Sequence, residues 1–324
     1  MKVAVLFNEP LPGAGADDQD VLIQREAVLA ALRECGHETL ALGCTLDLEH
    51  LRRELLQTGP EVVFNLVESL GGSDRLMPLV PQVLDVLQIP YTGAPAHAIL
   101  ATSNKVLAKQ QLRAADLPTP DWIDTHSQHV SRESSTGKWI VKPIWEHASL
   151  GMDDNSVVTV ESIDELQDLI QERNARMRTE HFAEQFIAGR EFNLSLLRGR
   201  VLPPAEIDFS AFPDGKPRIV GHAAKWDPES FEYHQTPRTF DFPTADEPLL
   251  QDLSQLAERC WQAFDLRGFA RVDFRVDTAG RAWILEINVN PCLSPDAGFA
   301  AALERAGIQF TEAIDQILSD AQRN

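Results

Sequence analysis

The chain has 324 residues, of which 49 are acidic and 29 are basic, so its formal net charge at pH 7 is −20. A chain this acidic lacks the basic face with which proteins neutralise phosphates, which argues against a nucleic-acid or anionic membrane partner. The hydrophobic fraction of 44% is that of an ordinary folded protein. At roughly 100–200 residues per domain, the length predicts two or three domains.

Cysteine usage and hydropathy predict a reduced, cytoplasmic protein. The apolar run at residues 3–7 is shorter than a signal peptide requires. No apolar run approaches the roughly 18–20 residues of a membrane span. The four cysteines are too few and too scattered for a disulfide framework or a thiolate metal site. They are Cys35, Cys44, Cys260 and Cys292.

Strand and helix patterns alternate through the first third of the chain. The apolar run Val3–Phe7 predicts a buried strand, and the pattern of Val21–Cys35 predicts a helix that stops at Gly36. Two further strands and two helices are expected at 39–42, 48–56, 62–67 and 76–87. Such alternation is typical of a parallel sheet covered by helices. The glycines within 12–15 lack the spacing of a dinucleotide-binding loop, so we expect no nicotinamide cofactor.

The rest of the chain predicts mixed helices and strands rather than a second alternating series. Helices are expected at 104–115, 163–174, 246–264, 297–306 and 313–318. Strands are expected at 139–142, 156–158, 181–186, 191–197 and 201–207. A hairpin is expected from strands 269–276 and 282–289 around the turn 277–280. These patterns indicate an α/β fold that continues into α+β units.

The hairpin carries the strongest chemical signal. Because side chains alternate along a strand, Arg271 and Asp273 share a face of its first strand, and Glu286 and Asn288 share a face of its second. The turn places the two pairs roughly opposite each other. Carboxylate and amide oxygens on rigid strands suit Mg²⁺, which prefers octahedral oxygen coordination. The alternative is an ordinary solvated hairpin face, on which polar and apolar residues also alternate.

Three lysines are candidates for phosphate binding. Lys142 ends a predicted strand and precedes a loop with Ser149 and Gly151, where its ammonium and the loop N–H groups could reach phosphate oxygens. Lys105 lies in the first turn of its helix, and Lys225 lies in a polar stretch further along. Each of the last two is also compatible with an ordinary surface lysine.

Taken together, these residues resemble the ATP-grasp superfamily and, within it, the D-alanine–D-alanine ligases, from about Val62 to Phe310. The resemblance implies an N-terminal parallel α/β domain at 1–95. It also implies two α+β subdomains, at 96–183 and 184–324, that clamp ATP between them. Many motifs in the right order are far more specific than any one of them.

The resemblance implies roles for individual residues. On the nucleotide side, the phosphate ligands would be Lys105, Lys142, Ser149 and Lys225, and the adenine and ribose ligands Glu184, Ile187 and Glu191. On the chemical side, Asp273, Glu286 and Asn288 match ligands of Mg²⁺ (or Mn²⁺), while Arg271 and Lys225 match catalytic residues. Arg271 would stabilise a tetrahedral intermediate.

The resemblance implies an ADP-forming ligase for amino acids or amines, with a homodimer as the expected assembly. A carboxylate attacks the γ-phosphate of ATP and becomes an acylphosphate, and an amine then displaces phosphate. Mg²⁺ and lysines would offset charge on the transferring group, and Arg271 would stabilise the oxyanion. Two alternatives stay open: an ATP-grasp kinase that joins no amine, and a non-catalytic nucleotide-binding homologue.

The sequence departs from the family on the amino-acid side. D-alanine ligases carry a His-Gly stretch and a Ser-x-Glu, and this chain offers only Glu9 or Asp17 as substitutes near its first strand. A family serine that binds the second substrate's carboxylate aligns with Ala297, beside Asp296, whose charge would repel a carboxylate. We therefore expect a retained nucleotide apparatus and a re-specified amino-acid pocket. Three nearby residues whose roles stay open are His147, Cys292 and Asp296.

Overall fold

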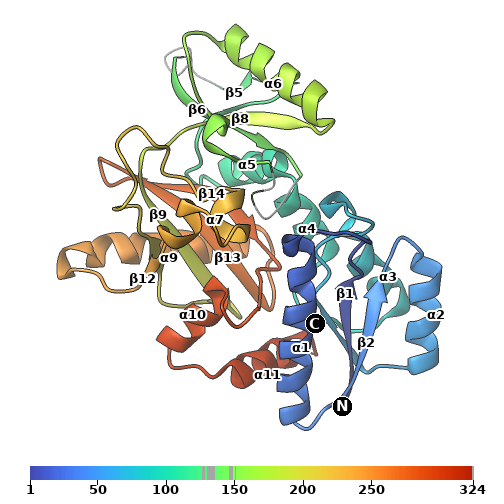
Figure 1. Ribbon diagram of the computed structural model, residues 1–324. Coiled ribbons are helices and arrows are strands. Elements are labelled where there is room, and N and C mark those ends of the chain that lie inside the picture. Colours follow the sequence, from blue (N-terminus) through green and yellow to red (C-terminus); the bar gives the residue numbers. More distant parts are fainter. Residues whose placement is uncertain (126–127, 130–135, 146–148, 150, 323–324) are drawn as a thin grey trace.

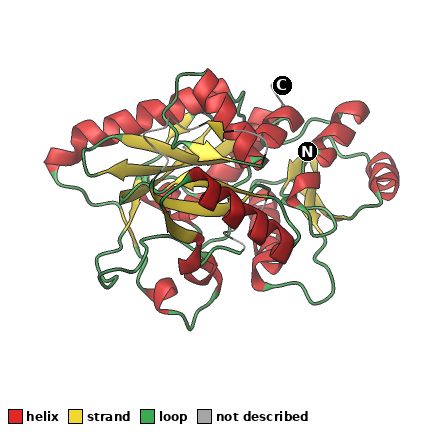
Figure 2. Cartoon of the chain, turned by 90° about the horizontal axis from the view of Figure 1, so that it is seen from above, coloured by secondary structure: helices red, strands yellow, loops and turns green. Residues whose placement is uncertain are grey.

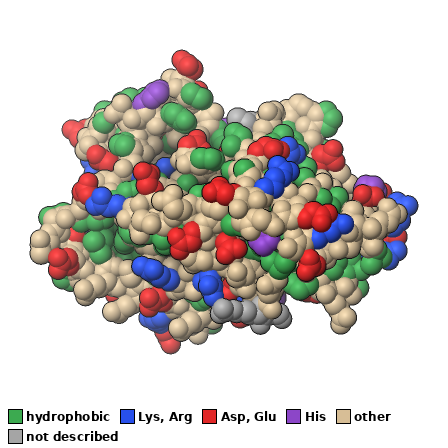
Figure 3. All heavy atoms as spheres, turned by 90° about the horizontal axis from the view of Figure 1, so that it is seen from below, with side chains coloured by type: hydrophobic (Ala, Val, Ile, Leu, Met, Phe, Trp, Pro, Cys, Tyr) green, Lys and Arg blue, Asp and Glu red, His purple; other side chains and the backbone are tan. Residues whose placement is uncertain are grey.

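Three sheets organise the chain in the computed structural model, which describes residues 1–125, 128–129, 136–145, 149 and 151–322 (Figure 1). The first sheet is parallel and the other two are antiparallel, as the alternation followed by mixed elements predicts. In these described ranges, no helix combines the length and the apolar character that a membrane crossing needs. Acidic and basic side chains are interspersed on the face shown in Figure 3.

The N-terminal sheet has the strand order β2-β1-β3. Its elements are β1 (Lys2–Asn8), α1 (Ala16–Glu34), β2 (Glu38–Cys44), α2 (Leu48–Thr58), β3 (Val62–Asn65), the 3-10 turn η1 (Asp74–Leu76) and α3 (Leu79–Leu87). Val3 and Val5 of β1 pack into a core with α1, whereas Ala4 and Leu6 pack on the other face with α2 and α3. Both faces of the sheet are therefore covered, which explains its nearly continuous apolar strands.

Three details of this unit correct the sequence predictions. Helix α1 begins at Ala16 rather than Val21, because the residues before Val21 carry no apolar signal. The helix expected at 76–87 begins only at Leu79, after η1 and Pro78. Helix α4 (Ala96–Ser103) was not predicted, since its short run of small residues has no polar stripe, although Ala98 and Ile99 are buried.

The central antiparallel sheet has the order β5-β4-β8-β6-β7. Its elements are α5 (Lys105–Ala114), β4 (Trp122–Ile123), β5 (Gln128–His129), β6 (Gly137–Pro143), the 3-10 turn η3 (Asp154–Ser156), β7 (Val157–Val160), α6 (Ile163–Met177) and β8 (His181–Gln185). Strands β4 and β5 were not predicted, because two residues each are too short for a pattern. Helix α6 covers one face, where Leu166 and Ile170 pack on Trp139 and Val141. The alternate residues of β6 therefore point to the opposite face.

The C-terminal sheet has the order β12-β11-β9-β13-β14, and β10 pairs with β9. Its elements are β9 (Gly189–Leu197), β10 (Arg200–Val201), β11 (Ala205–Ile207), α7 (His222–Trp226), α8 (Phe231–His234), β12 (Arg238–Thr239), the 3-10 turn η4 (Thr244–Asp246), α9 (Glu247–Ala263), β13 (Phe269–Asp277), β14 (Ala282–Asn288), α10 (Gly298–Arg305) and α11 (Phe310–Ala321). The strand predicted at 201–207 is two strands, because Pro203 and Pro204 cannot donate ladder hydrogen bonds. Helices α7 and α8 were not predicted.

The last helices return to the N-terminal unit, which lies at one end of the molecule (Figures 1 and 2). Ile314 and Ile317 of α11 share a core with Val28 and Leu32 of α1. This helix is longer than the predicted 313–318 and buries five side chains. The first and last parts of the chain are thus held in one core, and the division at 95 and 183 stays a proposal.

Candidate active site

One cavity of about 540 Å³ brings together the residues predicted for the site. A volume of roughly 300–1,000 Å³ is usual for small-molecule sites. The cavity lies among the central sheet, the C-terminal sheet and the edge of the N-terminal unit. Its lining includes Lys105, Lys142, Ser149, Glu184, Ile187, Glu191, Lys225, Arg271, Asp273, Glu286 and Asn288.

The hairpin has the pairing that its sequence predicts. Arg271 lies opposite Asn288 and Asp273 lies opposite Glu286, with a register shift directly after Asp273. Asp273 is 6% exposed. The alternative of a solvated hairpin face is therefore wrong, because this face forms a wall of the cavity.

Asp273 is held by three side chains. Arg271 donates from Nε to Oδ1 at 2.7 Å and from Nη2 to Oδ2 at 2.8 Å. Asn193 donates to Oδ1 at 2.8 Å, and Asn288 donates to Oδ2 at 3.2 Å. Asn193 was not predicted, although it shares a strand face with Glu191, two residues earlier, and that alternation was the available signal.

The oxygen atoms on the hairpin are of the types that bind a divalent cation. Asp273, Glu286 and Asn288 supply two carboxylates and an amide, the oxygen types that Mg²⁺ prefers. Among the described residues, no three His, Cys, Asp or Glu side chains form a metal-binding group, so this set depends on the Asn288 amide. A cation on Asp273 would also compete with Arg271 for the same oxygens. The metal assignment stays a prediction.

Cationic side chains concentrate around Glu286. Burial alone would raise the pKa of Glu286, but Lys105, Lys225, Lys142 and Arg271 outweigh it and hold that pKa well below the usual range. Burial, together with Arg271, lowers the pKa of Lys225. The fold thus gathers four cations around Glu286, with carboxylates such as Asp273 and Glu191 beside them, in a protein whose net charge is −20. Such focusing attracts a polyanionic ligand.

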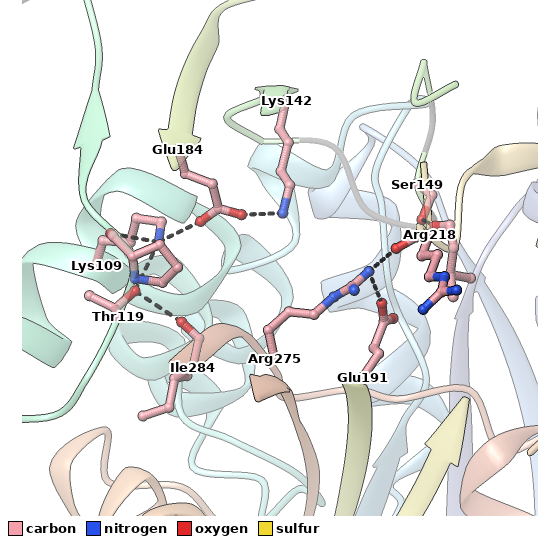
Figure 4. A network of polar contacts seen from close by, with 11 residues as sticks. Lys109, Thr119, Lys142, Ser149, Glu184, Glu191, Arg218, Arg275 and Ile284 are labelled. Carbon is pink, nitrogen blue, oxygen red and sulfur yellow. Dashed lines mark hydrogen bonds and ion pairs between the residues drawn. The ribbon is translucent and has the colours of Figure 1, made fainter. Parts of the chain in front are cut away.

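Glu184 lies between two lysines (Figure 4). Its carboxylate forms ion pairs with Lys142 and with Lys109, whose Nζ lies 2.6 Å from Oε2. Burial opposes the charge of Glu184, yet the two lysines lower its pKa. The family resemblance implied that Glu184 binds the adenosine part of ATP, and Lys109 was not predicted. Lys109 follows Lys105 at the i, i+4 spacing that puts both on one helix face, which was the available signal.

Glu191 pairs with an arginine that was not predicted to contribute. Arg275 Nη2 lies 2.7 Å from Glu191 Oε2, and Arg275 donates to the carbonyl oxygens of Gly189, at 3.1 Å, and Arg218. Burial raises the pKa of Glu191, and Arg275 opposes that rise. A Cβ at Gly189 would lie 1.9 Å from the Val276 carbonyl oxygen, so only glycine fits there. Gly189, two residues before Glu191, is therefore required for steric reasons.

Two carboxylates, Asp20 and Glu68, line the cavity where the N-terminal unit meets it. We call this pair the acidic wall. Gln24 Nε2 donates to both, at 3.1 Å to Asp20 and 3.0 Å to Glu68. The Cys292 thiol and the Ser294 hydroxyl also donate to Asp20, at 3.0 and 2.8 Å. The wall is thus fixed in place by neutral donors from α1 and from the segment after β14.

The open question about Cys292 is answered by its surroundings. Burial, Asp20 and Glu68 all raise the pKa of the Cys292 thiol. A thiol raised above its ordinary pKa stays protonated at neutral pH, and the thiolate is the nucleophilic form. Cys292 therefore acts as a hydrogen-bond donor to the acidic wall rather than as a nucleophile.

Asp296 shares its end of the cavity with an arginine that the sequence analysis missed. Arg238 donates from Nη1 to the Asp296 carbonyl oxygen at 3.2 Å. A Cβ on Gly298 would lie 3.4 Å from Arg238 Nε, so the guanidinium lies over the N-terminus of α10. Burial and the neighbouring Arg271 lower the pKa of Arg238. Positive charge therefore stands beside Asp296.

The substitutes considered from sequence for the amino-acid side need revision. Glu9 is not among the residues that line the cavity, whereas Asp20 and Glu68 are. Glu68 follows directly after the predicted strand 62–67, and the carboxyl ends of parallel strands are where ligands bind in such sheets. That position was the available signal. His147 and the side chain of Asp17 lie outside the described residues.

Comparisons with known proteins cover nearly the whole chain. The family described as "D-ala D-ala ligase C-terminus" matches residues 112–319. The D-alanine–D-alanine ligase of Nitrosococcus oceani is 31% identical over 99% of this chain and 93% of the relative. That of Aquifex aeolicus is 29% identical over 98% of this chain and 100% of the relative.

Two further matches add to these. An uncharacterized protein of Sinorhizobium fredii, y4sG, is 30% identical over 92% of this chain and 87% of its own length. The solved structure of D-alanine–D-alanine ligase from Bacillus anthracis complexed with ATP has a TM-score of 0.75 at 20% identity, and the match covers 100% of this chain and 98% of that one. The relatives thus include proteins with a stated activity and one without.

Proposed function

Because the chain belongs to the D-alanine–D-alanine ligase family of ATP-grasp ligases, we propose that it uses ATP and Mg²⁺ to join a carboxylate to an amine. The observation that carries this proposal is the one cavity lined by all eleven residues matched to the nucleotide, metal and catalytic sites. The four cations around Glu286 supply the positively charged donors that a triphosphate needs, although carboxylates line the same cavity. An arginine at this point would not be needed for nucleotide binding alone.

In the first proposed step, a carboxylate oxygen attacks the γ-phosphorus of ATP, and the bond to the ADP oxygen breaks. Lys105, Lys142 and Lys225 hold the triphosphate and offset the charge on the transferring group. Mg²⁺, held by Asp273, Glu286 and Asn288, supplies further charge neutralisation when bound. The products of this step are an acylphosphate and ADP.

In the second proposed step, a neutral amine attacks the acyl carbon. The C–N bond forms, the bond from that carbon to the phosphate oxygen breaks, inorganic phosphate leaves, and the nitrogen loses a proton. Arg271 stabilises the oxyanion of the tetrahedral intermediate. Its Nε and Nη2 bond Asp273, which leaves Nη1 for the reacting oxygen.

In this proposal, a substrate places a positively charged group next to the N-terminal unit. Asp20 and Glu68 form a fixed acidic wall, which suits an ammonium group of a substrate. Arg238 offsets the repulsion that Asp296 would exert on an anionic group. The acid pair and Arg238 differ from the serine and glutamate expected of D-alanine ligases, so the proposed substrate pair is not D-alanine with D-alanine.

The test is an ADP-release assay, with product mass spectrometry, over amino acids and amines supplied singly and in pairs with ATP and Mg²⁺. The proposal expects ADP release that depends on an amine and a new product with the mass of an amide. Phosphate release that needs no amine would contradict ligation and favour a kinase. Full turnover with D-alanine alone would contradict the re-specified pocket.

A further inference from the structure

Figure 4 shows a buried triad of charges, two members of which line the cavity. Its members are Lys109, Glu184 and Lys142, with Glu184 between the two lysines. The side chains of Lys109 and Glu184 are each 1% exposed, whereas Lys142 is 11% exposed. Lys142 and Glu184 line the cavity, and Lys109 is not among the lining residues. Among the described residues that line the cavity, Glu184 is the one with which Lys109 forms an ion pair.

The Lys109 ammonium has three polar partners. Its Nζ donates to Thr119 Oγ1 at 2.8 Å and to the Pro120 carbonyl oxygen at 3.4 Å, besides the ion pair with Glu184. The Trp122 ring centroid lies 5.8 Å from the same atom, within cation–π range. These contacts fix the ammonium in a single place, which is uncommon for a flexible lysine side chain.

The charge of the triad explains why a second lysine is present. A buried carboxylate that faced Lys142 alone would cancel the charge of the lysine that the nucleotide needs. Burial lowers the pKa of Lys109, and the Glu184 carboxylate opposes that shift. With a charged Lys109 on the other oxygen, two ammonium groups share one carboxylate, and the group keeps one positive charge. Lys109 also lowers the pKa of Glu184, so the carboxylate stays ionised and continues to hold Lys142.

We infer that Lys109 is a positioning residue for nucleotide binding: it fixes Glu184 and leaves the charge of Lys142 available to the triphosphate. This inference rests on the proposed function, because it assumes that Lys142 meets a phosphate. Lys109 touches no substrate in this account and acts through Glu184.

The same contacts join the triad to the hairpin. Thr119 accepts from Lys109 and donates its own hydroxyl to the Ile284 carbonyl oxygen at 2.9 Å. Ile284 lies on β14, two residues before Glu286, and its N–H donates to the Pro118 carbonyl oxygen at 2.8 Å. These hydrogen bonds therefore connect the triad to β14, the strand that carries Glu286.

The test compares Lys109→Met, Lys109→Arg and the double variant Lys109→Met/Glu184→Gln with the unaltered protein. MgATP affinity is measured by calorimetry, and KM for ATP and kcat are measured per folded molecule. In Lys109→Met the remaining pair is neutral, so we expect KM for ATP to rise about tenfold while kcat changes less than about threefold, the pattern of lost uniform binding. Lys109→Arg keeps the charge and should stay within about threefold of the unaltered KM.

The change Glu184→Gln separates charge from structure. Glu184 is also matched to the adenine site, so the double variant is compared with Glu184→Gln alone, which shares that change. Once the carboxylate charge is gone, Lys109 has no charge to offset, so we expect the two proteins to bind MgATP within about threefold of each other. A merely structural role predicts a lower melting temperature of Lys109→Met with an unchanged KM for ATP. If Lys109→Met does not fold, the double variant decides, because a neutral buried pair is expected to fold. A tenfold loss of affinity from Glu184→Gln to the double variant contradicts the inference.

Lys216→Met is the matched control. Lys216 also bridges two carboxylates, Asp154 and Glu232, at 2.6 Å each, and lies away from the cavity lining. Its replacement should leave MgATP affinity unchanged. If the unaltered protein binds no adenine nucleotide, the proposed function fails, and this inference fails with it. If that protein binds MgATP and Lys109→Met binds it equally well, only the inference is contradicted.

Discussion

The proposed nucleotide end of the cavity and its proposed amino-acid end differ in how their carboxylates are held. At the nucleotide end, acids pair with cations of the protein: Asp273 with Arg271, Glu191 with Arg275, and Glu184 with two lysines. At the amino-acid end, Asp20 accepts hydrogen bonds from three neutral donors, Gln24, Cys292 and Ser294.

This difference indicates that one end serves phosphoryl transfer and the other end selects the substrate. Paired charges orient one another before any ligand arrives, and such preorganisation is what phosphoryl transfer needs. A carboxylate fixed by neutral donors, as Asp20 is, keeps its charge for a substrate cation. The nucleotide end matches the family, whereas the amino-acid end rests on a few side chains from α1, the strand end at Glu68 and the segment after β14. Few changes there can alter the substrate without disturbing the chemistry.

The largest expected effect is a loss of turnover when a proposed Mg²⁺ ligand is replaced at the nucleotide end. Asp273→Asn or Glu286→Gln removes a proposed Mg²⁺ ligand, and we expect Mg²⁺-dependent turnover to fall on the order of a thousandfold. Circular dichroism should show a largely unchanged fold. Steady-state ADP release over a Mg²⁺ series measures the loss, and a variant at the rate of the unaltered protein would make the metal assignment wrong.

The next effect concerns the arginine of the hairpin. Arg271→Met removes the proposed oxyanion donor, so we expect kcat to fall about a hundredfold while KM for ATP changes little. Measuring kcat and KM for ATP separately checks this. A rise in KM for ATP with an unchanged kcat would instead give Arg271 a nucleotide-binding role.

At the amino-acid end, removal of a carboxylate charge should change KM for the amino-acid or amine substrate and leave KM for ATP unchanged. For Asp20→Asn or Glu68→Gln, we expect KM for the ammonium-bearing substrate to rise about tenfold, since a charged hydrogen bond contributes about 1.5–3 kcal/mol. KM for ATP should stay unchanged, as measured by initial rates at saturating co-substrate. Ser254→Ala, at a half-buried position of α9 that does not line the cavity, is a control that should alter neither value. Equal changes in both KM values would erase the distinction between the two ends.

A smaller effect is expected in the pH dependence of nucleotide use. Burial raises the pKa of Glu191, so this carboxylate gains its proton at a higher pH than an exposed glutamate as the solution is acidified. The acid-side fall of kcat/KM for ATP should therefore begin above the ordinary glutamate range. Glu286, whose pKa is lowered, stays ionised there. Glu191→Gln should flatten that limb, and an unchanged acid limb would contradict this origin.

The smallest expected effect is on stability. Asn104 caps α5, where its side chain accepts from the Leu107 N–H at 2.9 Å. Asn104→Ala should cost about 1 kcal/mol of unfolding free energy. Thermal unfolding measures this, and Asn104→Ser, which keeps a cap, is the control. A loss of several kcal/mol would mean that α5 carries more of the fold than its cap.

The sequence predicted the hairpin well, because strand alternation and one turn fix which side chains face each other. Arg271, Asp273, Glu286 and Asn288 meet as that pattern requires. The residues that lie behind this surface were missed. Lys109 and Arg275 act through partners that are distant in sequence, Glu184 and Glu191, and no local pattern encodes such contacts.

Other features could not be predicted because they depend on packing between segments that are distant in the sequence. The acidic wall forms because α1 meets the segment after β14, 272 positions from Asp20 to Cys292. Helix α4 is buried by the C-terminal sheet rather than by its own amphipathic stripe. The split of 201–207 was readable from its two prolines, since proline cannot donate in a ladder. Short elements such as β4 and α8 offer too few residues for any period.

The most direct test of the central claim, carboxylate activation by ATP followed by amine attack, follows an oxygen atom. The protein is supplied with ATP, Mg²⁺ and pooled amino acids labelled with ¹⁸O in their carboxylates. If an acylphosphate forms and an amine displaces phosphate, one ¹⁸O atom moves into the released phosphate, and a labelled amide product appears with it. Phosphate released without ¹⁸O would contradict the account.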